Sequence, residues 1–229
     1  MADPAPKKAV RILKIVAAVI LLPALFFVPA GTLNWPEAWI FIGLYLAVTY
    51  GMVLWMKKKN PALLKERQRK KPEAKRWDKI LVRVYSGVLT VMFILVGLDA
   101  VRFRWSRVPV ALKAVGFLGL LPAAALMFWA LRENAYLSNM VYIQEERGHR
   151  VCTTGPYRHV RHPYYAGVIL FFLSIPLALG SFYGLIPGFA ISLLFVARTV
   201  LEDRTLRREL PGYQDYALKV RYRLLPGIW

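Results

Sequence analysis

Long apolar runs separated by polar segments dominate this chain. A helix needs about 20 apolar residues to cross the core of a bilayer, and several runs approach that length. Four of the runs predict membrane helices, at Ile15–Ala30, Ala38–Met56, Ile80–Val101 and Ala111–Leu131. No strand is expected, so the pattern indicates an all-α, polytopic membrane protein.

Two further apolar runs, Tyr164–Leu179 and Phe182–Val200, follow later in the chain and are separated by Gly180 and Ser181. We interpret them as a helical hairpin, since turn-forming residues divide two apolar segments. Each arm is short for a full crossing. The prediction is an integral membrane helical bundle of about five to six membrane helices, including this C-terminal hairpin. The charged and aromatic tail Leu201–Trp229 comes last.

The first apolar run follows a basic segment, as in a signal peptide. Residues 1–14 carry the basic side chains, and Val28-Pro29-Ala30 would be a poor cleavage site. Because further apolar runs follow, we expect the first run to be retained as a membrane helix.

Composition agrees with a membrane protein. The hydrophobic fraction of 57% and the mean hydropathy of +0.41 exceed those of soluble domains. The net charge of +19 could suggest nucleic acid, but membrane proteins gather Lys and Arg in cytoplasmic loops, and no nucleic-acid partner is expected. Such loops also attract anionic lipids. Cys152 is the only cysteine, which excludes an intramolecular disulfide.

The segment Lys57–Lys79 holds eleven basic and three acidic residues, which predicts a cytosolic loop. We expect part of this loop to lie on the membrane as an amphipathic helix, with Leu63, Leu64 and Trp77 facing lipid. With the N-terminus in the cytosol, segments 57–79, 132–163 and 198–229 share the cytosolic side. Their convergence points to a site at that surface.

The stretch Gly155–Gly167 is the most unusual part of the chain. It holds two each of Pro, His, Arg and Gly and three Tyr directly before an apolar run. A polar cluster at a membrane entrance costs free energy and so calls for a function. Gly155-Pro156 predicts a turn, and Pro163 suits the first turn of the following helix. The alternative is an interfacial anchor of aromatic and basic residues.

The residue types of this stretch suit a cofactor. Backbone amides at the helix start, with Arg158 or Arg161 nearby, would suit a carboxylate. The rings of Tyr157, Tyr164 and Tyr165 could stack on a base or contact a sulfonium.

A metal site and the common nucleotide motifs are not expected. His149, His159 and His162 raise the possibility of zinc, but Pro163 ends any helix there and no further ligand is implied. The chain has no Gly-rich phosphate loop of the usual kinds and no Ser nucleophile elbow.

A second constellation contains Arg198 and Glu202. They are four residues apart and therefore share one face of a helix at the membrane exit. Their spacing alone equally fits a surface ion pair.

Together, the two motifs resemble the isoprenylcysteine carboxyl methyltransferase family, which is related to membrane phospholipid methyltransferases. The first motif stands at Gly155-Pro156-Tyr157, Arg161-His162-Pro163, Tyr165 and Gly167. The second stands at Arg198, Glu202, Asp203, Leu206, Gly212, Tyr213, Tyr216, Arg223 and Pro226. The resemblance covers roughly residues 139–229, and the preceding spans agree only in hydropathy. Leu210-Pro211-Gly212-Tyr213 departs from many relatives, which have Phe-Gly and two more residues before the Tyr.

The resemblance implies an S-adenosylmethionine site at the cytosolic ends of the last helices. The implied cofactor contacts are Gln144, His149, Arg150, Val151, Cys152, Tyr157, His162, Pro163, Tyr164, Tyr165 and Glu202. Arg198 and Glu202 are the implied catalytic residues, and Arg198 positions the acceptor. Residues 136–229 would then form the catalytic region, and residues 1–135 the N-terminal membrane helices with the basic loop.

The identity of Arg198 bears on the acceptor. Its planar cation suits a carboxylate and repels an ammonium group. We therefore expect O-methylation of a lipophilic, prenylcysteine-like carboxylate that reaches the site from the bilayer, in a bacterial plasma membrane. Three alternatives stay open: a phospholipid N-methyltransferase, an NADPH-binding sterol-type reductase, and a non-catalytic membrane scaffold.

Overall fold

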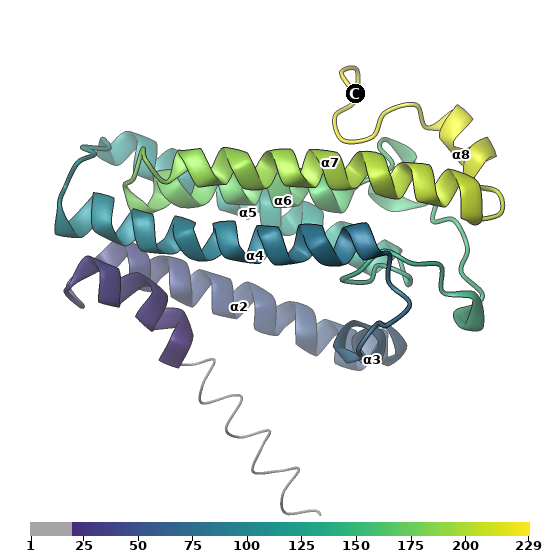
Figure 1. The fold of residues 1–229 in the computed structure, drawn as a ribbon, viewed down its shortest axis with the longest axis horizontal. Helices are drawn as coiled ribbons and strands as arrows, with labels where there is room; N and C mark the ends of the chain where they lie inside the picture. Colours follow the sequence, from purple (N-terminus) through teal and green to yellow (C-terminus); the bar gives the residue numbers. More distant parts are fainter. Residues whose placement is uncertain (1–19) are drawn as a thin grey trace, which may run out of the picture.

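The computed structural model describes residues 20–229, and every regular element in that part of the chain is helical (Figure 1). The chain is helical over Ile20–Ala30. The other elements are α2 (Pro36–Lys59), α3 (Pro61–Gln68), α4 (Arg76–Gly97) with its π-helical continuation η1 (Leu98–Arg102), α5 (Val110–Glu133), the 3-10 turns η2 (Glu145–Arg147) and η3 (Gly155–Arg158), α6 (Pro163–Leu179), α7 (Leu185–Glu209) and α8 (Tyr213–Lys219). The basic start of the chain and the first part of the first apolar run lie outside the described residues.

The predicted all-α membrane bundle is confirmed. Four helices are long and apolar enough to cross a membrane: α2, α4 with η1, α5 and α7. The helix Ile20–Ala30 and α6 are apolar but shorter. Large apolar side chains such as Leu118, Ile186 and Leu193 are exposed on these helices. A contiguous exposed apolar surface of this kind fits contact with lipid.

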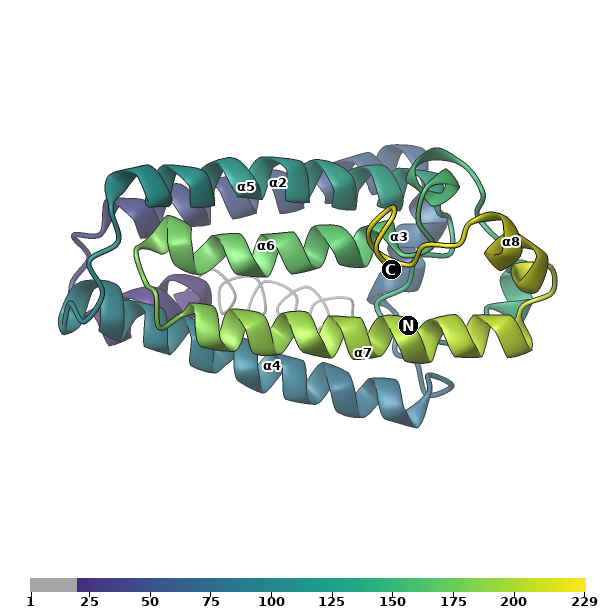
Figure 2. The ribbon, with the colours of Figure 1, turned by 90° about the horizontal axis from the view of Figure 1, so that it is seen from above.

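One end of the bundle gathers the polar segments of the chain. Helices α2, α5 and α7 end there, α4 and α6 begin there, and α3 and α8 lie beside them (Figures 1 and 2). We call this the pocket end. The predicted meeting of segments 57–79, 132–163 and 198–229 at one end is confirmed.

Proline and asparagine set the helix starts at the pocket end. Pro61 and Pro163 occupy the first turns of α3 and α6, where a missing N–H leaves no hydrogen bond unmade. The side chain of Asn60 accepts a hydrogen bond of 3.0 Å from the N–H of Leu63 and so caps α3.

Helices α5 and α6 pack closely through small residues. A Cβ atom at Gly116 would lie 2.3 Å from the backbone N of Ala178. A Cβ atom at Gly119 would likewise lie only 2.4 Å from Oγ of Ser174. Small residues at such contacts let helix backbones approach each other in membranes. The resulting contact fixes the start of α6 relative to the end of α5.

The opposite end of the bundle is tied together by Asp99, whose side chain is fully buried. Its carboxylate accepts hydrogen bonds from the backbone N–H and hydroxyl of Ser106, both at 2.7 Å, and from Ser181 and the N–H of Tyr183. The link after α4 is therefore joined to the turn between α6 and α7. Satisfied hydrogen bonds offset the cost of burying this carboxylate.

Two expectations from the sequence were wrong. Leu63 does not face lipid: it is fully buried and packs with Met56 and Leu131, because α3 folds back under the ends of α2 and α5. The second arm of the hairpin is not short, since α7 has 25 residues and continues to Glu209. The charged residues after Val200 extend the helix rather than begin a tail.

Gly116→Ala should destabilise the protein by about 1–3 kcal/mol, because the added methyl group has to displace the α6 backbone. Gly43→Ala on α2 is the matched control, since nothing lies within 4 Å of its Cβ position. Thermal unfolding of the purified protein in detergent measures both. Equal unfolding midpoints for the two variants would contradict the close α5–α6 contact.

Candidate functional site

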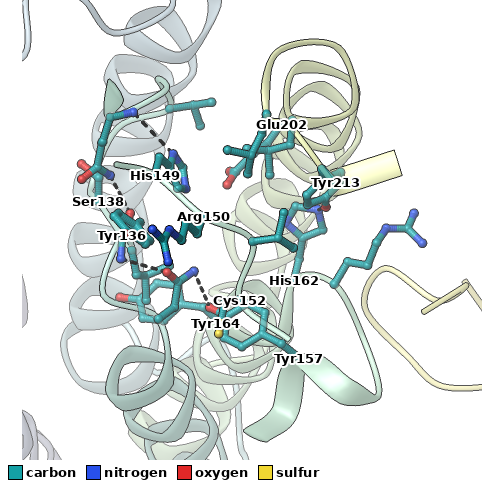
Figure 3. A pocket seen from close by; sticks show the side chains of 18 of the residues that line it. Tyr136, Ser138, His149, Arg150, Cys152, Tyr157, His162, Tyr164, Glu202 and Tyr213 are labelled. Carbon is teal, nitrogen blue, oxygen red and sulfur yellow. Dashed lines mark hydrogen bonds between the residues drawn. The ribbon is translucent and has the colours of Figure 1, made fainter. Parts of the chain in front are cut away.

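A partly open pocket lies at the pocket end (Figure 3). One wall is the irregular segment 134–152, and the other is formed by the start of α6 and the last turns of α7. Expected cofactor residues that line it are Gln144, His149, Arg150, Val151, Cys152, Tyr157, His162, Tyr164, Tyr165 and Glu202. Pro163 and Arg198 are the expected residues outside this lining.

The wall 134–152 is held by its own polar contacts. The buried amide of Gln144 donates a hydrogen bond of 2.7 Å to the carbonyl of Tyr136. The hydroxyl of Tyr136 in turn donates to the carbonyl of Gly148 at 2.8 Å, and its ring lies 4.6 Å from the ring of His149. These contacts turn the segment back on itself, so that His149 and Arg150 lie in the pocket (Figure 3).

His149 is held neutral by its surroundings. Burial, and secondarily the charge of Arg147, lower the pKa of His149 to about 4. Its Nδ1 lies 3.4 Å from the backbone N–H of Gln144, which donates to it. Neutral imidazole is the form that accepts this hydrogen bond.

The turn at Gly155 places the ring of Tyr157 in the lining of the pocket. Gly155 has a φ of +56°, and a Cβ atom there would lie 2.4 Å from Cγ of Glu133, so only glycine fits without a shift. The turn buries Tyr157, whose hydroxyl accepts a hydrogen bond of 3.3 Å from the amide of Asn134. Burial raises the pKa of Tyr157 far above its usual range. Tyr157 is therefore a neutral, fixed ring.

The opposite wall joins α6 to α7. The hydroxyl of Tyr165 donates a hydrogen bond to the carboxylate of Glu202. The rings of His162 and Tyr165 are stacked, with 5.8 Å between centroids and 4° between planes. An aromatic face and a carboxylate thus line the same side of the pocket, which suits a ligand with a cationic group.

A buried carboxylate, Asp203, lies behind this wall. It accepts hydrogen bonds from Arg161 at 2.7 and 3.1 Å, from Arg207 at 3.1 Å, from Arg223 at 3.2 Å and from Tyr213 at 3.0 Å. Arg161 also donates to the carbonyls of residues 220 and 221. The prediction that Arg161 is available for a ligand carboxylate was therefore wrong: its guanidinium is committed to Asp203 and to the C-terminal segment. Arg158, the other candidate, is exposed and outside the pocket lining.

The basic loop also reaches the pocket. Tyr142 lines it and donates to Glu66, while the guanidinium of Arg69 donates to the Tyr142 hydroxyl at 3.0 Å. Burial, with Glu66 next, raises the pKa of Tyr142 to about 12. Arg67 donates to the carbonyl of Leu137 at 2.9 Å. The loop therefore braces the wall 134–152 from outside, a role that its composition did not indicate.

Arg198 does not form the surface ion pair that its spacing allows. It is 9% exposed, and its Nε lies 2.8 Å from Oδ1 of Asp78 in α4. Its guanidinium lies 5.3 Å from the ring centre of Tyr165. No role was predicted for Asp78, whose only signal in the sequence is that it is an acidic residue at the junction of a basic loop and an apolar run.

Within residues 20–229, no group of three or more His, Cys, Asp or Glu side chains is placed to hold a metal ion. His159 is exposed, apart from the pocket, whereas His149 and His162 line it. The pocket lining that the structure describes is aromatic and polar.

The fold and the pocket define a polytopic helical membrane protein with an aromatic and polar pocket at one end of its bundle. Residues 110–211 match the family described as phospholipid methyltransferase. This family is related to the isoprenylcysteine carboxyl methyltransferases, so the resemblance is confirmed, and it extends to α5. The match supports a membrane methyltransferase.

A curated relative is the nickel-cobalt-cadmium resistance protein NccN of Alcaligenes xylosoxydans xylosoxydans. It is 28% identical over 145 residues, which is 61% of this chain. The aligned part spans 64% of the relative's own length.

The lowered pKa of His149 predicts a pH dependence of stability. The unfolded chain takes up this proton near pH 6.5 and the folded chain only near pH 4, so the contribution of His149 is complete above pH 6.5 and is lost as the pH falls towards 4. The thermal midpoint should therefore fall less between pH 7 and pH 5 in His149→Asn, which keeps an acceptor for Gln144. His159→Asn, which removes an exposed imidazole, is the control. A pH slope in His149→Asn as steep as that in the wild type would contradict a neutral His149.

Proposed function

We propose that this protein is an integral membrane S-adenosylmethionine-dependent methyltransferase that O-methylates a lipophilic carboxylate. The observation that carries the proposal is that one pocket is lined by all the residues that the family resemblance implies for the cofactor except Pro163. The match to a family described as phospholipid methyltransferase agrees with a pocket at the end of a membrane bundle.

The donor set of the pocket fits this cofactor. Glu202 offers a carboxylate for an ammonium or hydroxyl group, and Arg150 offers a cation for a carboxylate. The rings of Tyr157, Tyr164 and Tyr165 offer flat faces for a base or a sulfonium. We assign the irregular segment His149–Cys152 to one side of the cofactor and His162 to the other.

When bound, S-adenosylmethionine supplies an electrophilic methyl group on a cationic sulfur. Transfer of that methyl group to an acceptor oxygen, with the sulfur leaving as a neutral thioether, would need in-line alignment of the two reactants more than proton transfer. Glu202 and Tyr165 are hydrogen-bonded to each other and would hold that wall of the pocket in one orientation. A carboxylate acceptor is already ionised near neutral pH and needs no general base.

The acceptor is expected to approach from the bilayer between α4 and α7. A narrow, mainly apolar crevice there is lined by Leu81, Val82, Tyr85, Leu194, Phe195 and Arg198. The rings of Tyr85 and Phe195 are 5.4 Å apart, and Phe195 is 5.4 Å from Tyr165 of the pocket wall. Aromatic contacts thus connect the crevice to the pocket wall at Tyr165, and Arg198 lies beside them to receive a carboxylate.

The second candidate function is N-methylation of an aminophospholipid. The family description names phospholipid methyltransferases, and Asp78 already balances the charge of Arg198. A balanced arginine repels an amine acceptor less than a free one does.

We further propose that the pocket end faces the cytosol of a bacterial cell, because the basic loop 57–79 lies there. Residues 136–229 would form the catalytic region, supported by α5 and braced by the basic loop of residues 1–135. The partners are a lipophilic or lipid-anchored acceptor and membrane lipids.

Purified protein in detergent should transfer a labelled methyl group from S-adenosylmethionine to a prenylcysteine analogue as a base-labile ester. Glu202→Gln should lower kcat/KM by about 10- to 100-fold, because it removes a charged contact that aligns the cofactor. Glu209→Gln, on the exposed end of the same helix, is the matched control and should retain full activity.

Phosphatidylethanolamine serves as the competing acceptor in the same assay. Labelling of the amine alone would overturn the carboxylate assignment in favour of the second candidate. If neither acceptor is labelled and S-adenosylmethionine leaves the unfolding temperature unchanged, the methyltransferase proposal itself fails.

A further inference from the structure

Asp78 is a buried carboxylate between the lipid-facing crevice and the pocket wall. It lies in the first turn of α4, and its side chain is fully buried. A buried charge needs a partner to offset the loss of hydration. Its partners belong to two segments that are far apart in the chain, which makes Asp78 a connection between them.

The first partner is the pocket wall. Oδ2 of Asp78 accepts a hydrogen bond of 2.7 Å from the backbone N–H of Val141. The backbone N–H of Lys75 donates a hydrogen bond of 3.0 Å to the carbonyl of Val141. Both backbone groups of Val141, which lines the pocket, are therefore fixed by the start of α4.

The second partner is one edge of the Arg198 guanidinium. Nη2 donates to Oδ2 of Asp78 at 3.2 Å and to the carbonyl of Asn139 at 2.9 Å. Nε lies 2.8 Å from Oδ1, but this pair lacks the alignment of a hydrogen bond and is held by charge. Nη1 donates no hydrogen bond to any residue that the structure describes, so the Nη1 end of the guanidinium is the end left for a ligand.

We propose that Asp78 is the positioning residue of the acceptor site, holding Arg198 by its Nε–Nη2 edge so that Nη1 receives the anionic group of the acceptor. The inference rests on the proposed function, which assigns Arg198 to the acceptor. Asp78 has two effects there. Asp78 sets the direction of the Arg198 guanidinium, so that an anionic acceptor is held in one orientation. Asp78 also balances the charge of Arg198, so that the acceptor is held less tightly than it would be by an unpaired arginine.

A purely structural role would look different. Asp99 is equally buried, but its partners are Ser106, Ser181 and Tyr183 at the opposite end of the bundle. It contacts neither the pocket nor the crevice. Asp99 therefore provides a matched control: a buried carboxylate whose loss weakens the fold and leaves the acceptor site as it is.

Hydrogen exchange tests the positioning role without any substrate. Asp78→Ala in detergent should raise exchange of the amides in segment 139–142 by about tenfold, as expected for losing about 1.4 kcal/mol of local stabilisation. Asp78→Asn keeps an oxygen that accepts the hydrogen bond from Val141, and it should raise the exchange of these amides less than Asp78→Ala does. Asp99→Ala should raise exchange near residues 103–107 and leave 139–142 unchanged. Equal exchange of 139–142 in Asp78→Ala and Asp99→Ala would overturn the proposal.

Kinetics test the link to the acceptor. In Asp78→Asn, Arg198 loses its balancing charge and its fixed direction. The KM for the prenylcysteine carboxylate should fall by about threefold or more and kcat should fall by about 10- to 100-fold. The Kd of S-adenosylmethionine should stay within about threefold, and Asp99→Asn should keep the wild-type kcat and KM.

A rise in KM together with lower kcat and a lower unfolding temperature in Asp78→Asn would mean general loosening and would overturn the proposal. Wild-type protein that does not methylate the carboxylate at all would instead sink the proposed function. In that case the exchange measurement alone decides whether Asp78 positions the wall at Val141.

Discussion

The structure depends on one buried carboxylate, Asp203, surrounded by three guanidinium groups. Arg161 comes from the turn before α6, Arg207 from α7 itself, and Arg223 from the C-terminal segment. Removing one partner of a buried ion pair typically costs about 3–5 kcal/mol, since the remaining charge is left without hydration or a partner. Asp203 and its partners, with the hydroxyl of Tyr213, therefore hold the start of α6, the end of α7 and the start of α8 as one wall behind the pocket.

The facing wall depends on the other half of the chain. Arg69 and Asp78 hold Tyr142 and Val141 in place from outside the region that matches the family. A +19 chain would be expected to spread its basic residues over solvent, yet here several cations pair with buried carboxylates at the pocket end. The basic loop thus has the charge to attract anionic lipid, and it also braces the wall 134–152 by direct contact. The pocket forms where both halves of the chain meet.

Sequence patterns predicted the parts of this structure that depend on nearby residues. Apolar run lengths located the membrane helices, and Gly155-Pro156 and His162-Pro163 located the turn and the start of α6, because turn and helix-start preferences are local. The pairing of Asp78 with Arg198 joins residues 120 positions apart, and no local pattern specifies such a partner. The same reason explains Arg161: the preference of arginine for a carboxylate was correct, but the packing supplied Asp203 rather than a ligand.

The central claim is that the pocket between these two walls holds the cofactor. An experimental structure of the purified protein with S-adenosylhomocysteine tests it most directly. The account predicts ligand density between the His149–Cys152 segment and the wall of Tyr165 and Glu202, in contact with both. Ligand density elsewhere on the protein, or an ordered pocket without ligand at saturating concentration, would contradict it.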